Sequence, residues 1–176
     1  METREASDYN LIDDLYCFFF RFRVTASDGS EFVETDCQLE INLFETQEER
    51  LEAMRMMNLE IESGLSWPFE EEFKDFVSFS RYFMSHAAFV ARVRNVDEKS
   101  PQFQKSLPHG VVGCFYVKPN FPGRCSHVCN GGFIVKKEAR CNGIGQRMGA
   151  AFLPLASNLG YKSSFFNLVF VSNQVR

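Results

Sequence analysis

The residues with the clearest chemical potential lie between positions 132 and 149, where an apolar run leads into a glycine-containing turn. Arg140 is followed by Gly143 and Gly145 in the spacing Arg-x-x-Gly-x-Gly. A turn of this kind directs successive backbone N–H groups at one point, and a helix that begins there adds the positive end of its dipole. The glycines leave room for an anion to approach the backbone. The spacing therefore predicts a pyrophosphate site.

Two better-known phosphate motifs do not fit this stretch. A dinucleotide fingerprint needs Gly-x-Gly-x-x-Gly directly after a strand, with an acidic residue about 20 positions later. A Walker A loop ends in Gly-Lys-Ser or Gly-Lys-Thr, and neither tripeptide occurs in the chain. The turn is therefore expected to bind a different phosphate-bearing ligand.

The predicted turn requires a strand before it and a helix after it. An apolar run predicts the strand over 131–136, and apolar spacing predicts a helix over 144–158 that Gly160 ends. Residues 95–109 and 121–130 are expected to be loops. Alternating or aromatic runs predict further strands at 15–26, 32–43, 87–93, 111–117 and 165–171.

Two more helices are expected in the first half of the chain. Thr46 and Glu49 have the spacing of a capping box, which predicts a helix over 45–63 that ends at Gly64. A second helix is predicted from Pro68 through Met84. Its inner face would carry the aromatic residues Phe69, Phe73, Phe76 and Phe83.

Composition and the order of the predicted elements limit the possible classes of protein. A chain of 176 residues, 45% of them hydrophobic, is predicted to form one domain over 1–176, with residues 1–13 as a disordered leader. The order β-β-α-α-β-β-β-α-β predicts an α+β fold with helices packed on a sheet. A formal net charge of −4 argues against nucleic acid as a partner. No run is long and apolar enough to span a bilayer, so no membrane partner is predicted.

The first residues and the cysteines indicate the compartment. The start Met1–Glu5 has neither the basic region nor the apolar region of a secretory signal. The 6 cysteines are therefore predicted to be reduced thiols. We predict a cytoplasmic protein, and a mitochondrial location stays open.

The segment Cys125-x-His127-x-Cys129 invites a metal interpretation. Its spacing is not a usual zinc pattern, and no second pair follows except the single Cys141. The cysteines also lack a visible histidine and carboxylate partner set for nucleophilic catalysis. No metal and no cysteine nucleophile are predicted.

Three longer strings add to the turn. They are Asn58–Gly64, Gly113–Asn120 with Arg124–Asn130, and Gly160–Ser163 with Phe166–Gln174. Together with the Arg140–Gly145 turn they resemble the GNAT N-acetyltransferase superfamily. Within it, they are similar to the fungal enzymes that acetylate azetidine-2-carboxylate and other proline analogues. The resemblance covers residues 58–174.

The resemblance implies a GNAT fold, with a mixed, mostly antiparallel central sheet and helices on both faces. It also implies acetyl-CoA as co-substrate and a small cyclic imino or amino acid related to proline as acceptor. In the family, the asparagine that matches Asn130 contacts the imino acid, and the one that matches Asn167 lies beside the reacting centre. The one that matches Asn173 contacts CoA.

The same resemblance implies two binding segments for CoA. Its pantetheine arm would pair with the strand residues Phe133, Ile134 and Val135 like an added β-strand. That arm would enter where two parallel strands diverge. Its pyrophosphate would lie on the backbone amides of the turn residues Arg140, Cys141, Asn142, Gly143, Ile144 and Gly145.

Acetyl transfer from a thioester to an amine needs a deprotonated amine and a stabilised oxyanion. A backbone N–H near Phe133 or Ile134 would serve the oxyanion. No general base stands out, and Glu138 lies past the strand, towards the turn. An asparagine does not abstract a proton at neutral pH, so Asn130 and Asn167 are expected to orient the nucleophile. A carbonyl and a water remain as proton acceptors.

The chain departs from the family pattern after Gln174, where a helix and the last strands of the sheet would follow. We expect a C-terminally truncated enzyme, with an open sheet edge that favours a homodimer. The alternative is a catalytically inactive GNAT-like protein that binds CoA weakly or acts only through protein contacts. The physiological acceptor, the activity of this length, the oligomeric state and the general base stay open.

Overall fold

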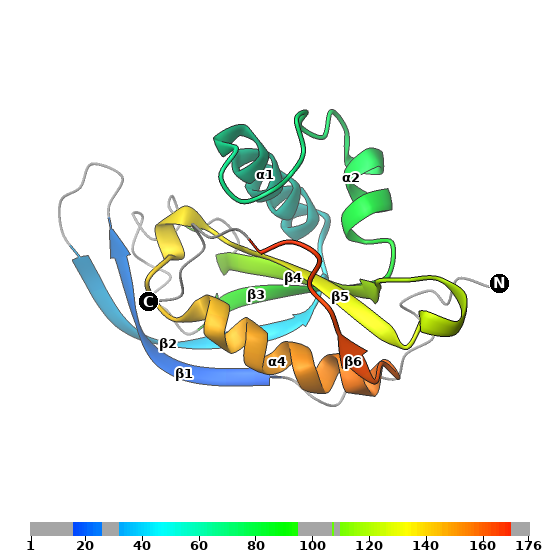
Figure 1. Cartoon of the computed structure of the whole chain (residues 1–176). Coiled ribbons are helices and arrows are strands. Elements are labelled where there is room, and N and C mark those ends of the chain that lie inside the picture. The colour runs from blue at the N-terminus through cyan, green and yellow to red at the C-terminus, as the bar shows by residue number, and fades with distance from the viewer. Residues whose placement is uncertain (1–15, 26–31, 95–106, 108–109, 170–176) are drawn as a thin grey trace.

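The computed structural model describes residues 16–25, 32–94, 107 and 110–169 (Figure 1). Six strands form one sheet in the order β1-β2-β3-β4-β5-β6. Neighbouring strands are antiparallel except for β5 and β6, which are parallel. The sheet is therefore mixed and mostly antiparallel, as predicted.

The strands are β1 (Tyr16–Thr25), β2 (Phe32–Leu43), β3 (Ala87–Arg94), β4 (Val111–Pro119), β5 (Val128–Val135) and β6 (Ser163–Ser164). The α-helices are α1 (Gln47–Ser63), α2 (Phe76–Phe83) and α4 (Ile144–Asn158). Two short 3-10 helices, η3 (Gly123–Cys125) and η4 (Lys137–Ala139), precede and follow β5.

The helices divide between the two faces of the sheet. Helices α1 and α2 cover one face, and α4 covers the other (Figure 1). Because side chains alternate along a strand, β5 contributes Cys129 and Phe133 to the α4 face and Ile134 to the α1–α2 face. Both faces bury an apolar core, which confirms the predicted α+β class with helices on both faces.

Helix α1 has the termini that its sequence predicts. The Thr46 side chain accepts a hydrogen bond from the Glu49 N–H at 3.2 Å, and the Glu49 carboxylate accepts one from the Thr46 N–H at 3.2 Å. These reciprocal bonds satisfy backbone donors that the first helical turn leaves open. Gly64 ends the helix in the left-handed region at φ 66°.

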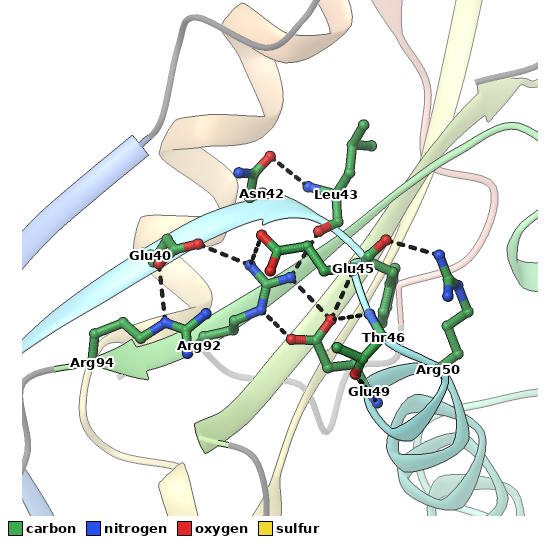
Figure 2. Close-up of polar contacts among 10 residues, drawn as sticks. Glu40, Asn42, Leu43, Glu45, Thr46, Glu49, Arg50, Arg92 and Arg94 are labelled. Carbon is green, nitrogen blue, oxygen red and sulfur yellow. Dashed lines mark hydrogen bonds and ion pairs between the residues drawn. The ribbon is translucent and has the colours of Figure 1, made fainter. Parts of the chain in front are cut away.

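A buried arginine fastens the start of α1 to the sheet (Figure 2). Arg92 of β3 has no exposed surface. Its guanidinium donates to both carboxylate oxygens of Glu49, and to Glu40 on β2 at 2.9 Å. It also donates to the Leu43 carbonyl at 2.9 Å. One carboxylate, that of Glu49, thus both caps the helix and holds it on β3.

The second helix is shorter than predicted. It begins after Asp75, whose side chain accepts from the Ser78 N–H at 2.7 Å. The preceding segment is held from outside, because the Asn58 amide both donates to the Phe73 carbonyl and accepts from the Phe73 N–H, each at 3.0 Å. These bonds replace the helical bonds that a helix over 68–84 would make. Phe69 and Phe73 nevertheless pack against the core, as their spacing predicted.

Two predicted strand boundaries are also wrong. β5 begins at Val128 instead of 131, so Asn130 lies within the strand rather than in a loop. β6 is only Ser163–Ser164, and the described part of the predicted strand over 165–171 is not a strand. The chain leaves the sheet there because the Phe166 ring packs on rings of the α4 face, Phe133 and Phe152.

Candidate functional site

In the turn between β5 and α4, side chains of the turn and of α4 donate hydrogen bonds to the backbone carbonyls. Arg147 on the first turn of α4 donates to the carbonyls of Asn142 at 3.1 Å and Gly143 at 3.2 Å. The Asn142 side chain donates to the carbonyls of Ala139 and Arg140, both at 3.1 Å. Within the turn backbone, the Arg140 N–H donates to the Lys137 carbonyl at 3.3 Å. These contacts fix the shape of the turn ahead of α4.

The start of α4 fits an anion. Gly143 is the N-cap in the left-handed region at φ 70°, and it supplies no side-chain cap. A Cβ added at Gly145 would meet only the Val135 side chain, at 3.7 Å, whereas one added at Gly143 would lie 2.7 Å from the Arg147 guanidinium. The space beside Gly145 is therefore open, and a cation borders it at Gly143. Cys141 also has a positive φ, 64°, which is uncommon for a residue with a side chain. Uncapped N–H groups and the helix dipole together favour negative charge here.

Arg140 differs from a solvated loop cation because its guanidinium contacts groups of the protein. Its Nε donates to the Val135 carbonyl at 3.1 Å, and its guanidinium forms an ion pair with Glu60 of α1. Glu60 also accepts from the Ser66 hydroxyl. Arg140 therefore ties the turn to α1 and to the end of β5. The string Asn58–Gly64 includes Glu60, but the sequence did not predict its pairing with Arg140, because the contact joins residues 80 positions apart.

β6 is paired along its two residues with the beginning of β5. The parallel register is Val128↔Ser163 and Cys129↔Ser164, and the Phe165 N–H donates to the Cys129 carbonyl at 2.8 Å. Past Cys129, no strand in the described part of the chain borders β5 on this side. The chain after β6 thus leaves the edge of β5, with α4 below and the segment after β6 crossing in front (Figure 1).

The backbone of β5 alternates between this open edge and β4. The Lys136 N–H donates to the Val112 carbonyl of β4 at 2.9 Å, and the register pairs Ile134 with Cys114. By alternation, the N–H of Phe133 points to the open edge, and that of Ile134 points to β4. Of the predicted strand residues, Phe133 and Val135 therefore have edge-facing backbone, and Ile134 is a buried core residue.

The structure locates two of the three asparagines. Asn130 lies on the α1–α2 face of β5, directly opposite Lys118 of β4. Asn167 is exposed after β6, and its side chain pairs with that of Asn120 through bonds of 3.0 and 2.6 Å. Asn173 lies outside the described residues. Asn120, at the end of the Lys-Pro-Asn string, was not predicted as a site residue.

An aromatic wall stands beside Asn130 on the same face. Gly132 has no side chain, and a Cβ there would lie 2.6 Å from the Tyr116 ring and 2.7 Å from the Trp67 ring. The Tyr82 and Tyr116 hydroxyls are 3.3 Å apart. Burial raises the pKa of the Tyr116 hydroxyl, which keeps it protonated. The rings therefore meet over β5, and Gly132 makes that approach possible.

The cysteines and histidines do not form a separate reactive centre in the described ranges. Cys114 and Cys129 are buried, and burial raises the pKa of both thiols. His127 is exposed, with Nδ1 3.0 Å from the Arg124 carbonyl. Among the described residues, no group of three or more histidine, cysteine or acidic side chains is arranged to hold a metal. Within those residues, no helix has the length and apolarity to cross a membrane.

Solved structures share this arrangement of sheet, turn and helices. A GCN5-related N-acetyltransferase from Kribbella flavida superposes with a TM-score of 0.57 and 17% identity, over 70% of this chain and 67% of that chain. An N-acetyltransferase from Staphylococcus aureus Mu50 superposes with a TM-score of 0.59 and 14% identity, over 77% and 76%. The protein thus has the GCN5-related N-acetyltransferase (GNAT) fold, as predicted.

One curated relative is closer in sequence. The N-acetyltransferase aca1 of Schizosaccharomyces pombe is 37% identical over 120 residues, which is 66% of this chain. The match covers 57% of the relative's length, so this chain spans little more than half of it. No family model matches the chain.

Proposed function

We propose that the protein is an acetyl-CoA-dependent N-acetyltransferase whose acceptor is a small cyclic imino or amino acid related to proline. One observation carries the proposal. The open edge of β5 leads directly into an uncapped glycine turn at the start of α4. An extended pantetheine arm pairs with a strand edge, and a pyrophosphate fits a helix start, so this order of features matches CoA. Similarity to aca1, an N-acetyltransferase by name, supports the reaction type.

The donor would be held by the backbone more than by side chains. Phe133 and Val135 would pair with the pantetheine amides along the open edge, and the amides at the start of α4, from Gly143 to Gly145, would bind the pyrophosphate. Acetyl-CoA supplies the thioester that is cleaved. An N–H of β5 in the region of Phe133 would stabilise the oxyanion that forms at the thioester carbonyl.

The acceptor would lie on the α1–α2 face, beside Asn130 and the aromatic wall formed by Trp67, Tyr82 and Tyr116. In the reaction, the acceptor nitrogen forms a bond to the acetyl carbon, the C–S bond breaks with CoA leaving as its thiolate, and the nitrogen loses a proton. Asn130 is an amide and orients the acceptor rather than removing that proton. Asn167, paired with Asn120, would orient the nucleophile from the β6 side. A carbonyl and a water remain as proton acceptors.

Calorimetry with acetyl-CoA tests the donor site, with two glycines of one helix as a matched pair. Gly143 and Gly160 flank α4, and both have positive φ, at 70° and 86°. Alanine at either position strains the backbone, so both variants are expected to lose about 1–2 kcal/mol of stability. At Gly143 the added Cβ would also displace the Arg147 guanidinium, whereas at Gly160 it meets open space. Only Gly143→Ala is expected to weaken acetyl-CoA binding, by roughly tenfold.

Turnover is measured by thiol release with azetidine-2-carboxylate as acceptor. Equal acetyl-CoA affinity of the two alanine variants, or no binding to the wild-type chain, would overturn the donor site. Binding of acetyl-CoA without thiol release from any cyclic imino acid would instead support a non-catalytic CoA-binding protein.

A further inference from the structure

The ammonium group of Lys118 lies among rings instead of carboxylates. Its Nζ is 4.0 Å from the centroid of the Tyr82 ring and 4.2 Å from that of the Tyr116 ring. The two tyrosines come from α2 and β4, so the ammonium lies between helix and sheet. Rings stabilise a cation through their quadrupole but do not neutralise it.

No negative charge balances this cation within the described ranges. The ion pairs found there use other lysines and arginines, and none includes Lys118. Burial lowers the pKa of Lys118. The pKa of His86 is lowered first by burial and then by the Lys118 charge. A half-buried ammonium without a counter-charge is costly unless a ligand supplies one.

A hydrogen-bonding amide stands beside the ammonium. Lys118 and Asn130 are directly opposite in the β4–β5 register, so their side chains leave the sheet on the same face. The described residues include no hydrogen-bonding partner for the Asn130 side chain. Trp67 and Tyr116 close the next position along the strands, over Gly132. An ammonium, an amide and a flat apolar wall thus converge on one position.

We infer that Lys118 is a specificity-determining residue that binds the carboxylate of the acceptor, with Asn130 beside it and the acceptor's ring against the aromatic wall. This inference rests on the proposed function for the identity of the acceptor. It also explains why the acceptor must carry a carboxylate. A carboxylate offers the missing negative charge, and a carboxamide of the same shape does not. The nitrogen next to that carboxylate would then face the open edge of β5.

Equilibrium binding tests this directly, with Trp67 as the probe. The chain has 1 tryptophan, and it lies in the aromatic wall, so its fluorescence reports an occupant there. Azetidine-2-carboxylate is titrated against azetidine-2-carboxamide, with and without CoA. The wild-type chain is expected to prefer the acid by roughly 10-fold to 100-fold. Lys118→Met is expected to abolish that preference, and Lys118→Arg to retain part of it.

Lys74→Met is the control, because Lys74 is an exposed lysine that pairs with Glu71 on the surface. It should leave the acid preference unchanged. A Lys118→Met variant that still prefers the acid, or a wild-type chain that binds the amide equally well or binds neither compound, overturns the inference. A general loss of packing would weaken the acid and the amide alike, so the ratio separates recognition from structure.

Failure of the proposed function would look different. If acetyl-CoA does not bind but the acid preference depends on Lys118, the carboxylate site stands and the acetyltransferase proposal falls. If acetyl-CoA binds and is turned over with acids and amides equally, the proposed reaction stands and the role of Lys118 falls.

Discussion

Arg92 and Lys118 are two cations on one face of one sheet, on the neighbouring strands β3 and β4, and their surroundings are opposite. Arg92 is fully buried and bound by the carboxylates of Glu49 and Glu40 (Figure 2). Lys118 is half-buried and touches rings. The difference separates a charge that the chain itself neutralises from a charge that the described residues leave for a ligand.

The residue types suit these two roles. The planar guanidinium of Arg92 presents several donors at fixed angles, which lets it bind two carboxylates and a carbonyl at once. The ammonium of Lys118 is a compact charge on a flexible stem, which suits a ligand that binds reversibly. Replacing each cation by methionine should therefore affect stability at one position and recognition at the other.

The largest effect is expected from Arg92→Met. It leaves the buried carboxylate of Glu49 without its partner, which costs about 3–5 kcal/mol of unfolding free energy. Urea denaturation measures this loss. Arg94→Met is the control, because Arg94 is exposed and also pairs with Glu40. Its cost should stay below about 1 kcal/mol. Equal losses in the two variants would contradict the distinction.

A smaller loss is expected from Glu49→Gln. The amide keeps the shape but loses charge-assisted hydrogen bonds to Arg92, which are worth about 1.5–3 kcal/mol. In the double variant with Arg92→Met, the added cost of Glu49→Gln should nearly vanish, because the two residues act as one unit. Additive losses in this double-mutant cycle would show that the ion pair is not what holds α1.

Acid should weaken the same contact. Burial alone would raise the pKa of the Glu49 carboxyl, but hydrogen bonds from Arg92 and from the backbone of Glu45 and Thr46 hold it below its ordinary value of 4.5. A group whose pKa is lowered by folding stabilises the protein above its unfolded pKa, and this stabilisation is lost as the pH falls through the folded pKa. The free energy of unfolding of the wild-type chain should therefore decrease as the pH is lowered beyond about 4.5. Urea midpoints across this pH range should change less for Glu49→Gln; parallel curves would be the contrary result.

The smallest effect on stability is expected from Lys118→Met. The substitution loses the contact of a cation with two rings, worth about 0.5–1 kcal/mol, and relieves the burial of an unbalanced charge. The net change in unfolding free energy should stay within about 1 kcal/mol of zero. Urea denaturation under the same conditions as for Arg92→Met provides the comparison. A loss of several kcal/mol would mean that Lys118 is a structural cation like Arg92.

Features that rest on local chemistry could be predicted from the sequence. The capping box of Thr46 and Glu49, the left-handed Gly64 and the bounds of α4 depend on residues within a few positions of one another. The turn from Arg140 to Gly145 belongs to the same class. Helix and turn signals of this kind do not depend on which residues pack against them in the tertiary structure.

The errors arose where distant residues compete with local propensity. Asn58 binds the backbone of Phe73 and prevents the helix that the aromatic spacing favours. The Phe166 ring packs on the α4 face and draws the chain out of the sheet after Ser164. Nothing near these residues in the sequence signals either contact.

By itself, the sequence determined the class of fold, the caps of α1 and the glycine turn, because each follows from periodicity or from neighbours in the chain. Only the tertiary structure decided which β5 amides face the open edge, that Glu49 meets Arg92, and that Lys118 stands opposite Asn130 beside the aromatic rings. Strand register and the packing of helices on a sheet set those contacts. They depend on the whole set of side chains at once, so short-range patterns do not specify them.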